Sequence, residues 1–325
     1  MKIFITGGAG YVGSKLVPKL LDLGHSVTVL DLMIYGEEVL EEHPNLKKIK
    51  GDIRNQKLLK KIIPGHNAVI HLACISNDPS FELNPSLGRS INYDAFEPLV
   101  KISRENFVNR FIYASSSSVY GIKKEKNVTE DMKLEPLTDY SKFKGWCEKI
   151  LNDYKSDDFI VTTIRPSTVC GYAKRQRLDL VVNILTNHAY HNNKIIVLGG
   201  EQLRPNIHIE DMINSYLAVL KSDYSKINGE IFNVGFKNQS VNELAMDVKK
   251  VIGKNVEITK KETNDNRSYH VSSQKIKDIL DFETKFTIQD AVRDLKKAFD
   301  NKLLFNSFEN KKYFNIKMMQ SIKLK

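Results

Sequence analysis

Two side chains near the middle of the chain have the spacing of an acid–base pair. In "DYSKFK", Tyr140 and Lys144 are four residues apart on a predicted helix, so both lie on one helix face. A nearby ammonium favours the phenolate and lowers the pKa of a tyrosine toward neutrality. The pair is therefore a candidate general base for an alcohol. The same spacing is also common on solvated helix faces, so it needs further support.

A run of four serines in "YASSSSVYG" follows the apolar stretch "RFIYA". Serine runs usually form solvated loops, because serine hydroxyls hydrogen-bond to nearby backbone groups. This run ends a predicted strand, where one hydroxyl could also take part in chemistry. The residue types alone leave both interpretations open.

Glycines near the N-terminus have the spacing of a dinucleotide site. "TGGAGYVGS" places Gly7, Gly10 and Gly13 between a predicted strand at 2–6 and a predicted helix at 11–24. Such glycines allow a tight turn and close approach of a diphosphate to a helix N-terminus. Asp31 ends the second predicted strand, where a carboxylate binds a ribose 2′-hydroxyl and repels a 2′-phosphate. The motif predicts NAD rather than NADP; the alternative is a structural turn beside a surface aspartate.

The elements that position these residues alternate regularly in the first half of the chain. Apolar runs predict strands at 2–6, 26–31, 68–73, 110–115 and 160–166, with helix-like segments before the later ones. This alternation predicts an α/β fold, in which helices cover both faces of a parallel sheet. After about residue 170 the alternation loosens into predicted helices at 176–192 and 240–253 and short strands at 194–200 and 230–235. This half is expected to form a smaller lobe.

Composition limits the class of protein. The 325 residues are 41% hydrophobic and 27% charged, which is typical of a folded globular protein. The sequence contains neither an apolar run long enough to span a membrane nor an export signal. Cys74, Cys147 and Cys170 are odd in number and widely spaced, which predicts neither disulfides nor a metal site. A cytoplasmic protein without membrane partners is expected.

The net charge of +10 raises the question of an anionic partner. The lysines are scattered, apart from "NLKKIK" and the C-terminal stretch "NKKYFNIKMMQSIKLK". This pattern favours a lysine-rich solvated surface over a nucleic-acid patch. An RNA-binding module remains the alternative from another functional class, and salt-sensitive RNA retention would support it.

Taken together and in order, several motifs carry a family resemblance. They are the glycine motif, Asp31, "GDIRN", "HLA", "SSSSVYG", Tyr140 with Lys144, "IRPSTVCG" and "RPNIHIEDM". In this combination the chain resembles the extended short-chain dehydrogenase/reductases that act on nucleotide sugars, over most of its length to about residue 300. These include UDP-glucose 4-epimerase-like enzymes, and the chain is also similar to GDP-heptose 4-dehydrogenases in "RQRLDLVVN" and "NDNRSYHVSS".

The resemblance implies a Rossmann-type, doubly wound domain over 1–170 that binds NAD, with segments returning from the C-terminal half. A nucleotide-sugar-binding lobe would span mainly 171–300, and 301–325 would be a basic tail without an assigned role. A homodimer is the usual assembly of such enzymes. The implied cofactor contacts beyond the glycines and Asp31 are Tyr11, Val12, Asp52, Ile53, Leu72, Ala73, Asn92, Tyr140 and Lys144.

The resemblance also assigns catalytic and substrate roles. Ser116, four residues before Tyr120, would hydrogen-bond the substrate hydroxyl together with Tyr140. The implied contacts of the nucleoside-diphosphate sugar are Ser116, Thr168, Arg177, Asn183, Arg204 and Arg267. Thr168 stands where many relatives have asparagine, and Cys170 and Tyr172 flank Gly171 in place of the usual aromatic and proline. These departures concern sugar identity and leave the redox centre intact.

Three reactions share a first step, the oxidation of the sugar at C4. A 4-epimerase returns the hydride to the other face of the 4-keto sugar, and a 4-dehydrogenase releases that sugar. A 4,6-dehydratase also needs an acid and a base, which related dehydratases place just after the serine or threonine. Here those positions hold Ser117 and Ser118, which do not titrate near neutral pH. The expectation is a 4-epimerase, with a net 4-dehydrogenase as the alternative and dehydration behind both.

Overall fold

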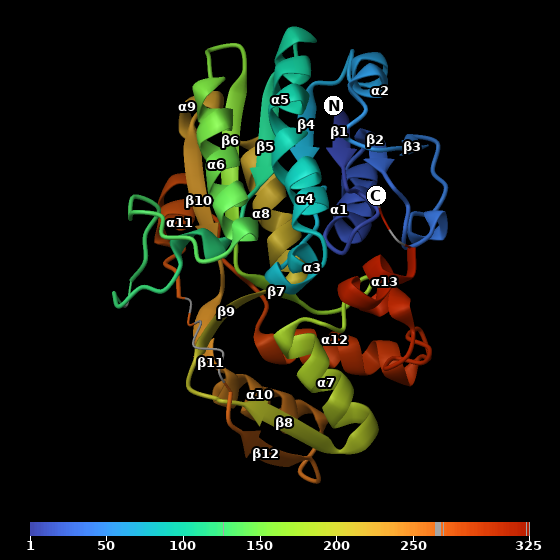
Figure 1. Ribbon diagram of the computed structural model, residues 1–325, viewed down its shortest axis with the longest axis vertical. Helices are drawn as coiled ribbons and strands as arrows, with labels where there is room; N and C mark the ends of the chain where they lie inside the picture. Colours follow the sequence, from blue (N-terminus) through green and yellow to red (C-terminus); the bar gives the residue numbers. More distant parts are fainter. Residues whose placement is uncertain (126, 264–267, 269, 323, 325) are drawn as a thin grey trace.

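The computed structural model describes residues 1–125, 127–263, 268, 270–322 and 324. Its centre is a seven-stranded parallel sheet with the order β10-β6-β5-β4-β1-β2-β3 (Figure 1). The strands are β1 (Lys2–Thr6), β2 (Ser26–Asp31), β3 (Leu46–Lys50), β4 (Ala68–His71), β5 (Arg110–Ala114), β6 (Ile160–Pro166) and β10 (Glu230–Val234). The strand order reverses between β1 and β4, which is where doubly wound sheets open a crevice for ligands.

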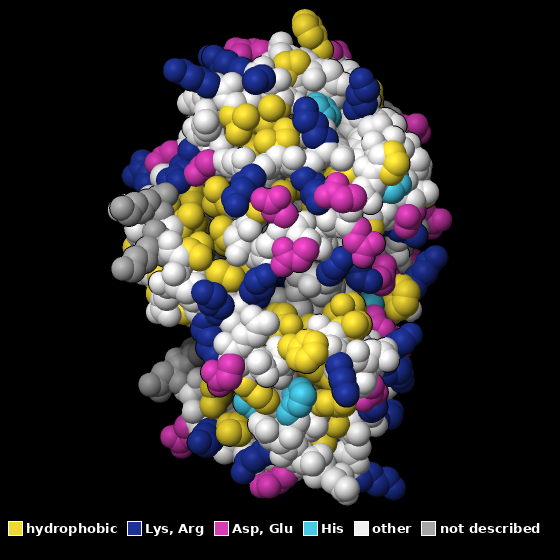
Figure 2. Space-filling model, turned by 90° about the vertical axis from the view of Figure 1, so that its right-hand side faces the viewer, with side chains coloured by type: hydrophobic (Ala, Val, Ile, Leu, Met, Phe, Trp, Pro, Cys, Tyr) yellow, Lys and Arg dark blue, Asp and Glu magenta, His cyan; other side chains and the backbone are white. Residues whose placement is uncertain are grey.

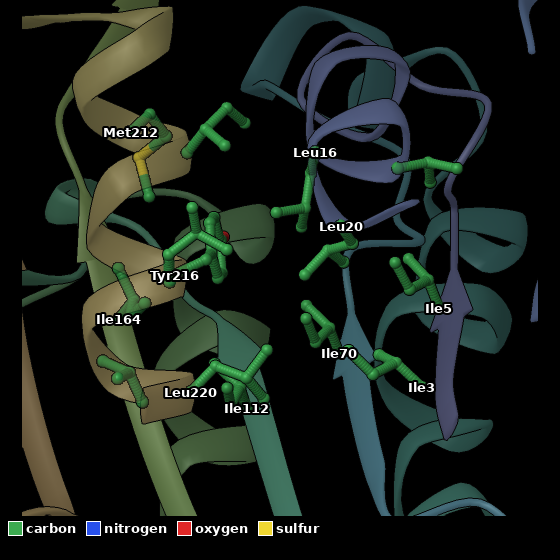
Figure 3. Close-up of a cluster of buried hydrophobic side chains, with 14 of the residues drawn as sticks. Ile3, Ile5, Leu16, Leu20, Ile70, Ile112, Ile164, Met212, Tyr216 and Leu220 are labelled. Atoms are coloured by element: carbon green, nitrogen blue, oxygen red, sulfur yellow. The ribbon is translucent and has the colours of Figure 1, made fainter. Parts of the chain in front are cut away.

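Helices cover both faces of this sheet, because its strands are apolar on both sides. On one face lie α1 (Gly13–Asp22), α8 (Ile209–Lys221) and α11 (Gln274–Leu280). On the other lie α2 (Gln56–Ile62), α5 (Phe96–Glu105) and α6 (Asp139–Asp153). Figure 3 shows the first core, where Leu16 and Leu20 of α1 and Tyr216 of α8 meet side chains of the sheet.

A smaller lobe lies beyond the carboxyl ends of the strands (Figure 1). Helices α7 (Val181–Asn192), α10 (Val241–Ile252) and α12 (Ile288–Asp300) pack there with the parallel pair β8 (Lys194–Leu198) and β12 (Glu257–Lys261). A three-stranded sheet of β11 (Lys237–Ser240), β9 (Leu203–His208) and β7 (Thr168–Cys170) leads into this lobe. Since β7 directly follows β6, the two parts of the molecule share a continuous backbone at the crevice.

The remaining elements are short, apart from the last helix. They are α3 (Asp78–Glu82), α4 (Pro85–Arg89), α9 (Tyr224–Ile227), the 3-10 turns η1 (Glu37–Val39), η3 (Ser117–Tyr120) and η4 (Lys311–Tyr313), and the π-helix η2 (Ser90–Asp94). Helix α13 (Asn315–Ile322) belongs to the basic tail at 301–325 and packs near α3. None of the described helices is long and apolar enough to cross a membrane.

Two local predictions were wrong in detail. The helix predicted at 176–192 begins at Val181, because Leu180 is extended and Arg177 pairs with Asp179 before the first turn. The lysine-rich stretch "NLKKIK" contains strand β3, which was not predicted. β3 is an edge strand, so it needs fewer apolar residues than a central one. The sheet and its helical layers otherwise agree with the predicted α/β class.

Candidate active site

A cavity of about 480 Å³ opens at the carboxyl ends of the central strands. Most of the predicted site residues line it, although they come from loops, strands and a helix that are far apart in the sequence. They are Gly7, Gly10, Tyr11, Val12, Gly13, Asp31, Asp52, Ile53, Leu72, Ala73, Ser116, Tyr140, Lys144, Thr168, Arg177 and Arg204. Asn92 and Asn183 lie behind its wall, and Arg267 lies outside the described residues.

The glycine loop has the shape that a dinucleotide requires. Gly7 has φ +75°, and a Cβ there would lie 2.5 Å from the backbone nitrogen of Ala73. A Cβ on Gly13 would lie 2.4 Å from the carbonyl oxygen of Gly8. Helix α1 begins at Gly13 without a side-chain cap and without an acidic residue in its first turn. No side chain of the N-cap residue Val12 therefore occupies the N-terminus of α1, and the loop fits a diphosphate.

Asp31 is held in place at the end of β2. Its two carboxylate oxygens accept hydrogen bonds from the backbone N–H groups of Ala9 (3.0 Å) and Met33 (2.8 Å). Burial raises the pKa of Asp31, whereas these two hydrogen bonds act in the opposite direction. Further along the cavity, Asp52 pairs with Arg54 at 2.6 Å. The carboxylate of Asp31 is thus fixed at the position where a ribose would lie.

Helix α6 carries the predicted catalytic pair. It starts at a capping box, in which Thr138 accepts from the N–H of Ser141 and the Ser141 hydroxyl accepts in return. Lys144 is 4% exposed, and its Nζ donates to the carbonyl of Ala114 at 2.6 Å. The same Nζ lies 5.9 Å from the centre of the Tyr140 ring. The ammonium is therefore oriented from the end of β5, on the same helix face as the phenol.

The pKa of Tyr140 differs from the sequence-based expectation. Burial raises it well above the ordinary value, and the charges of Cys74 and Asp78 act in the same direction. The charge of Arg177 and the hydroxyl of Ser116 lower it. The sequence predicted that Lys144 lowers the pKa of Tyr140. For the protein alone this prediction was wrong, because the desolvation of the buried phenol has a larger effect on its pKa than the nearby cations.

The four serines occupy four distinct environments. Ser115 donates to the buried carboxylate of Glu148. Ser116, the N-cap of η3, lies 2.8 Å from the hydroxyl of Ser118, and both line the cavity. Ser117 also lines the cavity and is 8% exposed. The run is therefore ordered structure, and among the serines that line the cavity Ser116 is the one whose hydroxyl interacts with Tyr140.

Two predicted contact residues instead support the cavity wall. Asn92 exchanges two hydrogen bonds with the backbone of Ile75, at 2.8 and 2.9 Å, and so holds the loop after β4. Asn183 accepts from the N–H of Gly171 and donates to the hydroxyl of Tyr11 at 3.1 Å. Both amides are buried and satisfied by the protein.

The opposite end of the cavity is formed by the second half of the chain. Thr168 begins β7 and Arg204 lies on β9. Arg177 pairs with Asp179 at 2.9 Å and reaches the hydroxyl of Ser76 at 3.3 Å. The Nη2 of Arg177 has no hydrogen-bond partner within the described part of the chain. These side chains present cationic and hydroxyl groups to the cavity.

Several lining residues had not been predicted, among them Cys74, Asp78, Arg175 and Asn315. Cys74 and Asp78 follow β4, and Asp78 accepts from the Thr138 hydroxyl at 2.5 Å. Their position just after "HLA" could have indicated them. Arg175 and Asn315 also line the cavity. Arg175 is two residues from a predicted contact, but no local pattern marks Asn315.

Comparisons with known proteins agree with this geometry. Residues 3–235 match the model of the NAD dependent epimerase/dehydratase family. A UDP-glucose 4-epimerase of Lactobacillus helveticus is 28% identical over 306 residues, covering 88% of this chain and 92% of that protein. An uncharacterized UDP-glucose epimerase of Bacillus subtilis is 32% identical over 249 residues, covering 72% of this chain and 77% of that protein.

Solved structures share the fold. The UDP-glucose 4-epimerase of Thermotoga maritima, with UDP-glucose, has a TM-score of 0.85 at 24% identity and covers 93% of this chain and 100% of its own. The dTDP-glucose 4,6-dehydratase DesIV of Streptomyces venezuelae, with NAD bound, has a TM-score of 0.84 at 22% identity and covers 94% of this chain and 99% of its own.

These findings confirm three predictions: the Rossmann-type fold class, the resemblance to nucleotide-sugar short-chain dehydrogenases, and NAD as the cofactor. The family match covers the glycine loop, Asp31, the serine run and the Tyr140–Lys144 pair. The chain is a member of the NAD-dependent epimerase/dehydratase family.

Proposed function

We propose that the protein oxidises C4 of a nucleoside-diphosphate sugar with NAD and that it is a nucleotide-sugar 4-epimerase. The observation that carries this proposal is the convergence of Ser116, Tyr140 and Lys144 on the cavity that also contains the glycine loop. A hydroxyl donor, a phenol and an ammonium beside a dinucleotide cradle are the groups that alcohol oxidation requires.

Each of these side chains has a defined part in the reaction. Tyr140 accepts the proton of the sugar 4-hydroxyl, and Ser116 hydrogen-bonds that hydroxyl and keeps it in line with the phenol. Lys144, held by the carbonyl of Ala114, stabilises the phenolate and binds the nicotinamide ribose. Bound NAD supplies the hydride acceptor. Because the unliganded environment raises the pKa of Tyr140, proton transfer is expected to need the charges present when cofactor and sugar are bound.

The second half of the cavity is proposed to hold the nucleotide and the sugar. Thr168, Arg177, Arg204 and Arg267 are the proposed contacts, and Asn183 positions the backbone of Gly171 and Arg177. Guanidinium groups suit diphosphate oxygens because they donate two parallel hydrogen bonds. The two curated relatives named above are described as UDP-glucose epimerases, which supports a UDP-hexose as the first substrate to test.

The cavity also bears on the alternatives. Ser117 and Ser118 line it and provide neither the acid nor the base that dehydration needs at those positions. The carboxylate of Asp78 also lines the cavity, and it is hydrogen-bonded to Thr138. A net 4-dehydrogenase acting on a GDP-heptose-like sugar is the second candidate, supported by "RQRLDLVVN", the stretch that places Arg175 and Arg177 in the cavity wall.

A panel of UDP-, GDP-, CDP- and dTDP-sugars tests the proposal. An epimerase gives a product of unchanged mass without accumulating reduced nicotinamide. A dehydrogenase accumulates reduced nicotinamide in proportion to the sugar, and a dehydratase forms a product lighter by one water. Absence of turnover with the whole panel, in protein that binds NAD, would contradict an enzyme acting on these sugars.

A further inference from the structure

The C-terminal segment 310–322 passes over the cofactor half of the cavity. Its turn η4 and helix α13 lie beside the carboxyl edge of the first sheet, on the side of β2 and β3 (Figure 1). At the start of the segment, Lys312 pairs with Glu38 at 2.8 Å and the carbonyl of Tyr313 accepts from the N–H of Leu178. Further on, Met319 and Leu324 line the cavity itself. The segment therefore forms part of the cavity wall.

Asn315 is the central contact of this segment. It is 5% exposed, and its Oδ1 accepts from the Tyr35 hydroxyl at 2.9 Å and from Arg175. Its Nδ2 donates to the hydroxyl of Ser76 at 2.8 Å, and its backbone N–H donates to Asp179 at 3.0 Å. These partners belong to the loops after β2, β4 and β7. One side chain from the C-terminal helix thus ties together the three loops around the cavity.

Arg175 is the unusual partner in this network. It is 4% exposed, and its Cζ lies 3.6 Å from the centre of the Tyr35 ring. Arg175 lines the cavity, and its Nε is buried without a hydrogen-bond partner among the described residues. None of the described carboxylates forms an ion pair with it, whereas the neighbouring Arg177 has Asp179. A guanidinium buried in this way needs an anion.

Within the network of side chains bonded to Asn315 and Asp179, the charges leave an excess of one positive charge. Arg175 and Arg177 contribute two positive charges, and Asp179 contributes one negative charge. The excess faces a cavity that also contains the uncapped N-terminus of α1. The backbone N–H of Arg175 donates to the Ser14 hydroxyl in the first turn of α1, at 3.3 Å, which places Arg175 beside the glycine loop. The anion that fits this position is the diphosphate of the dinucleotide.

We propose that the C-terminal segment is part of the NAD site: Asn315 holds Arg175 stacked on Tyr35 so that its guanidinium binds the NAD diphosphate, and α13 retains the cofactor. Arg175 contacts the cofactor and Asn315 is a positioning residue. The motifs place the NAD site in the first half of the chain, and the proposal adds residues 310–322 to that site. It does not depend on which sugar nucleotide the enzyme uses.

Two substitutions test the proposal in the full-length protein. Arg175→Met removes the cation and keeps the packing on Tyr35. Asn315→Asp keeps the shape and can accept from Tyr35, Arg175 and Ser76, but it supplies Arg175 with a carboxylate and cancels the excess charge. Each variant is expected to bind NAD roughly 10- to 100-fold more weakly. Arg293→Met and Asn301→Asp, at exposed positions on α12 and just after it, are the matched controls.

Calorimetric titrations with NAD, ADP, adenosine, UDP and GDP locate the loss. The proposal predicts weaker binding of NAD and ADP with unchanged binding of adenosine, less NAD retained per chain after gel filtration, and wild-type thermal unfolding of Asn315→Asp. Unchanged NAD affinity in both variants would overturn it. So would a loss confined to UDP and GDP, which would assign Arg175 to the substrate, or an equal loss of adenosine and NAD, which would indicate a structural defect.

Discussion

A substitution at Tyr140 should separate catalysis from the binding of NAD. The Tyr140 phenol lines the cavity with Ser116, whereas the glycine loop and Asp31, which are expected to hold the NAD diphosphate and ribose, belong to other elements of the cavity wall. Tyr140→Phe should therefore lower kcat by about 10²- to 10⁴-fold and leave NAD bound. Turnover and NAD content per chain are the measurements. Tyr154→Phe, at the C-terminal end of the same helix, is the control, and turnover retained by Tyr140→Phe would remove that residue from the role.

Arg177 should influence the pH dependence of the reaction rate through the pKa of Tyr140. Burial raises the pKa of Tyr140 and the charge of Arg177 lowers it. Since the base must be deprotonated, the rate should rise with increasing pH. Arg177→Met should move this rise to higher pH, because the phenolate loses a stabilising charge. Initial rates across neutral and alkaline pH check this prediction, and a profile like that of Arg293→Met would contradict it.

Asp31 should determine the choice between NAD and NADP. Its carboxylate is fixed by two backbone N–H groups, and it would lie close to a 2′-phosphate. Asp31→Asn removes the charge and keeps the side-chain shape, so the preference for NAD over NADP should fall by roughly tenfold. The ratio of the two dissociation constants is the measurement. An unchanged ratio would mean that another group holds the ribose.

At the scale of elements, a buried polar network fixes the serine run relative to α6. Arg165 of β6 pairs with Glu148 of α6 at 2.6 Å, and Glu148 also accepts from Ser115. Arg165 donates to the Tyr120 hydroxyl, which in turn donates to Asn233 of β10. The network connects two neighbouring strands, the turn after β5 and the catalytic helix. It explains why the serines are ordered.

Removing one charge from this network should destabilise the whole fold. Glu148→Gln leaves the Arg165 guanidinium buried, at 2% exposure of the residue, without its carboxylate. We expect a loss of about 3–5 kcal/mol in the free energy of unfolding, measured with urea. Lys149→Ala, exposed on the same helix, should change little. In the double variant Glu148→Gln/Arg165→Met the loss should be smaller than the sum of the single losses; additivity would argue against the ion pair.

Elements were predictable where the local pattern was strong. Apolar runs bounded by glycine or proline located β1, β6 and β10, and the predicted helix at 240–253 matches α10, of which Ser240 is the N-cap. Strand β3 was not predicted because three of its five residues are lysine. The start of α7 was predicted too early because Arg177 and Asp179 form an ion pair before the first turn and Leu180 is extended.

For the whole molecule, predictability depended on the range of the contacts. The glycine loop and the Tyr140–Lys144 pair are recognisable because their partners are near in sequence. The contact between Arg175 and Asn315 joins residues 140 apart, and no periodicity in the sequence could indicate it. The net charge of +10 likewise said little about function. Figure 2 shows lysines and arginines interspersed with acidic side chains on that face, a mixture unlike a continuous nucleic-acid-binding patch.

Assembly is the last property to test at this scale. Helices α5 and α6 lie side by side on one face of the sheet, and large apolar side chains are exposed on and beside them. Trp146 is 51% exposed and packs edge-on against Tyr93 and Phe143, while Phe107 after α5 is 86% exposed. Pairing this helix pair with its symmetry mate would bury these groups in a four-helix bundle.

We therefore expect a homodimer whose interface contains Trp146. Trp146→Glu should give a monomer in light scattering, because burying an unpaired carboxylate in an apolar interface is costly. Met246→Glu, at an equally exposed apolar position on α10, should remain a dimer. The monomeric variant should retain NAD, since the cofactor cavity is lined by residues of one chain. A dimer that persists in Trp146→Glu would place the interface elsewhere, and a monomeric wild-type protein would contradict the prediction outright.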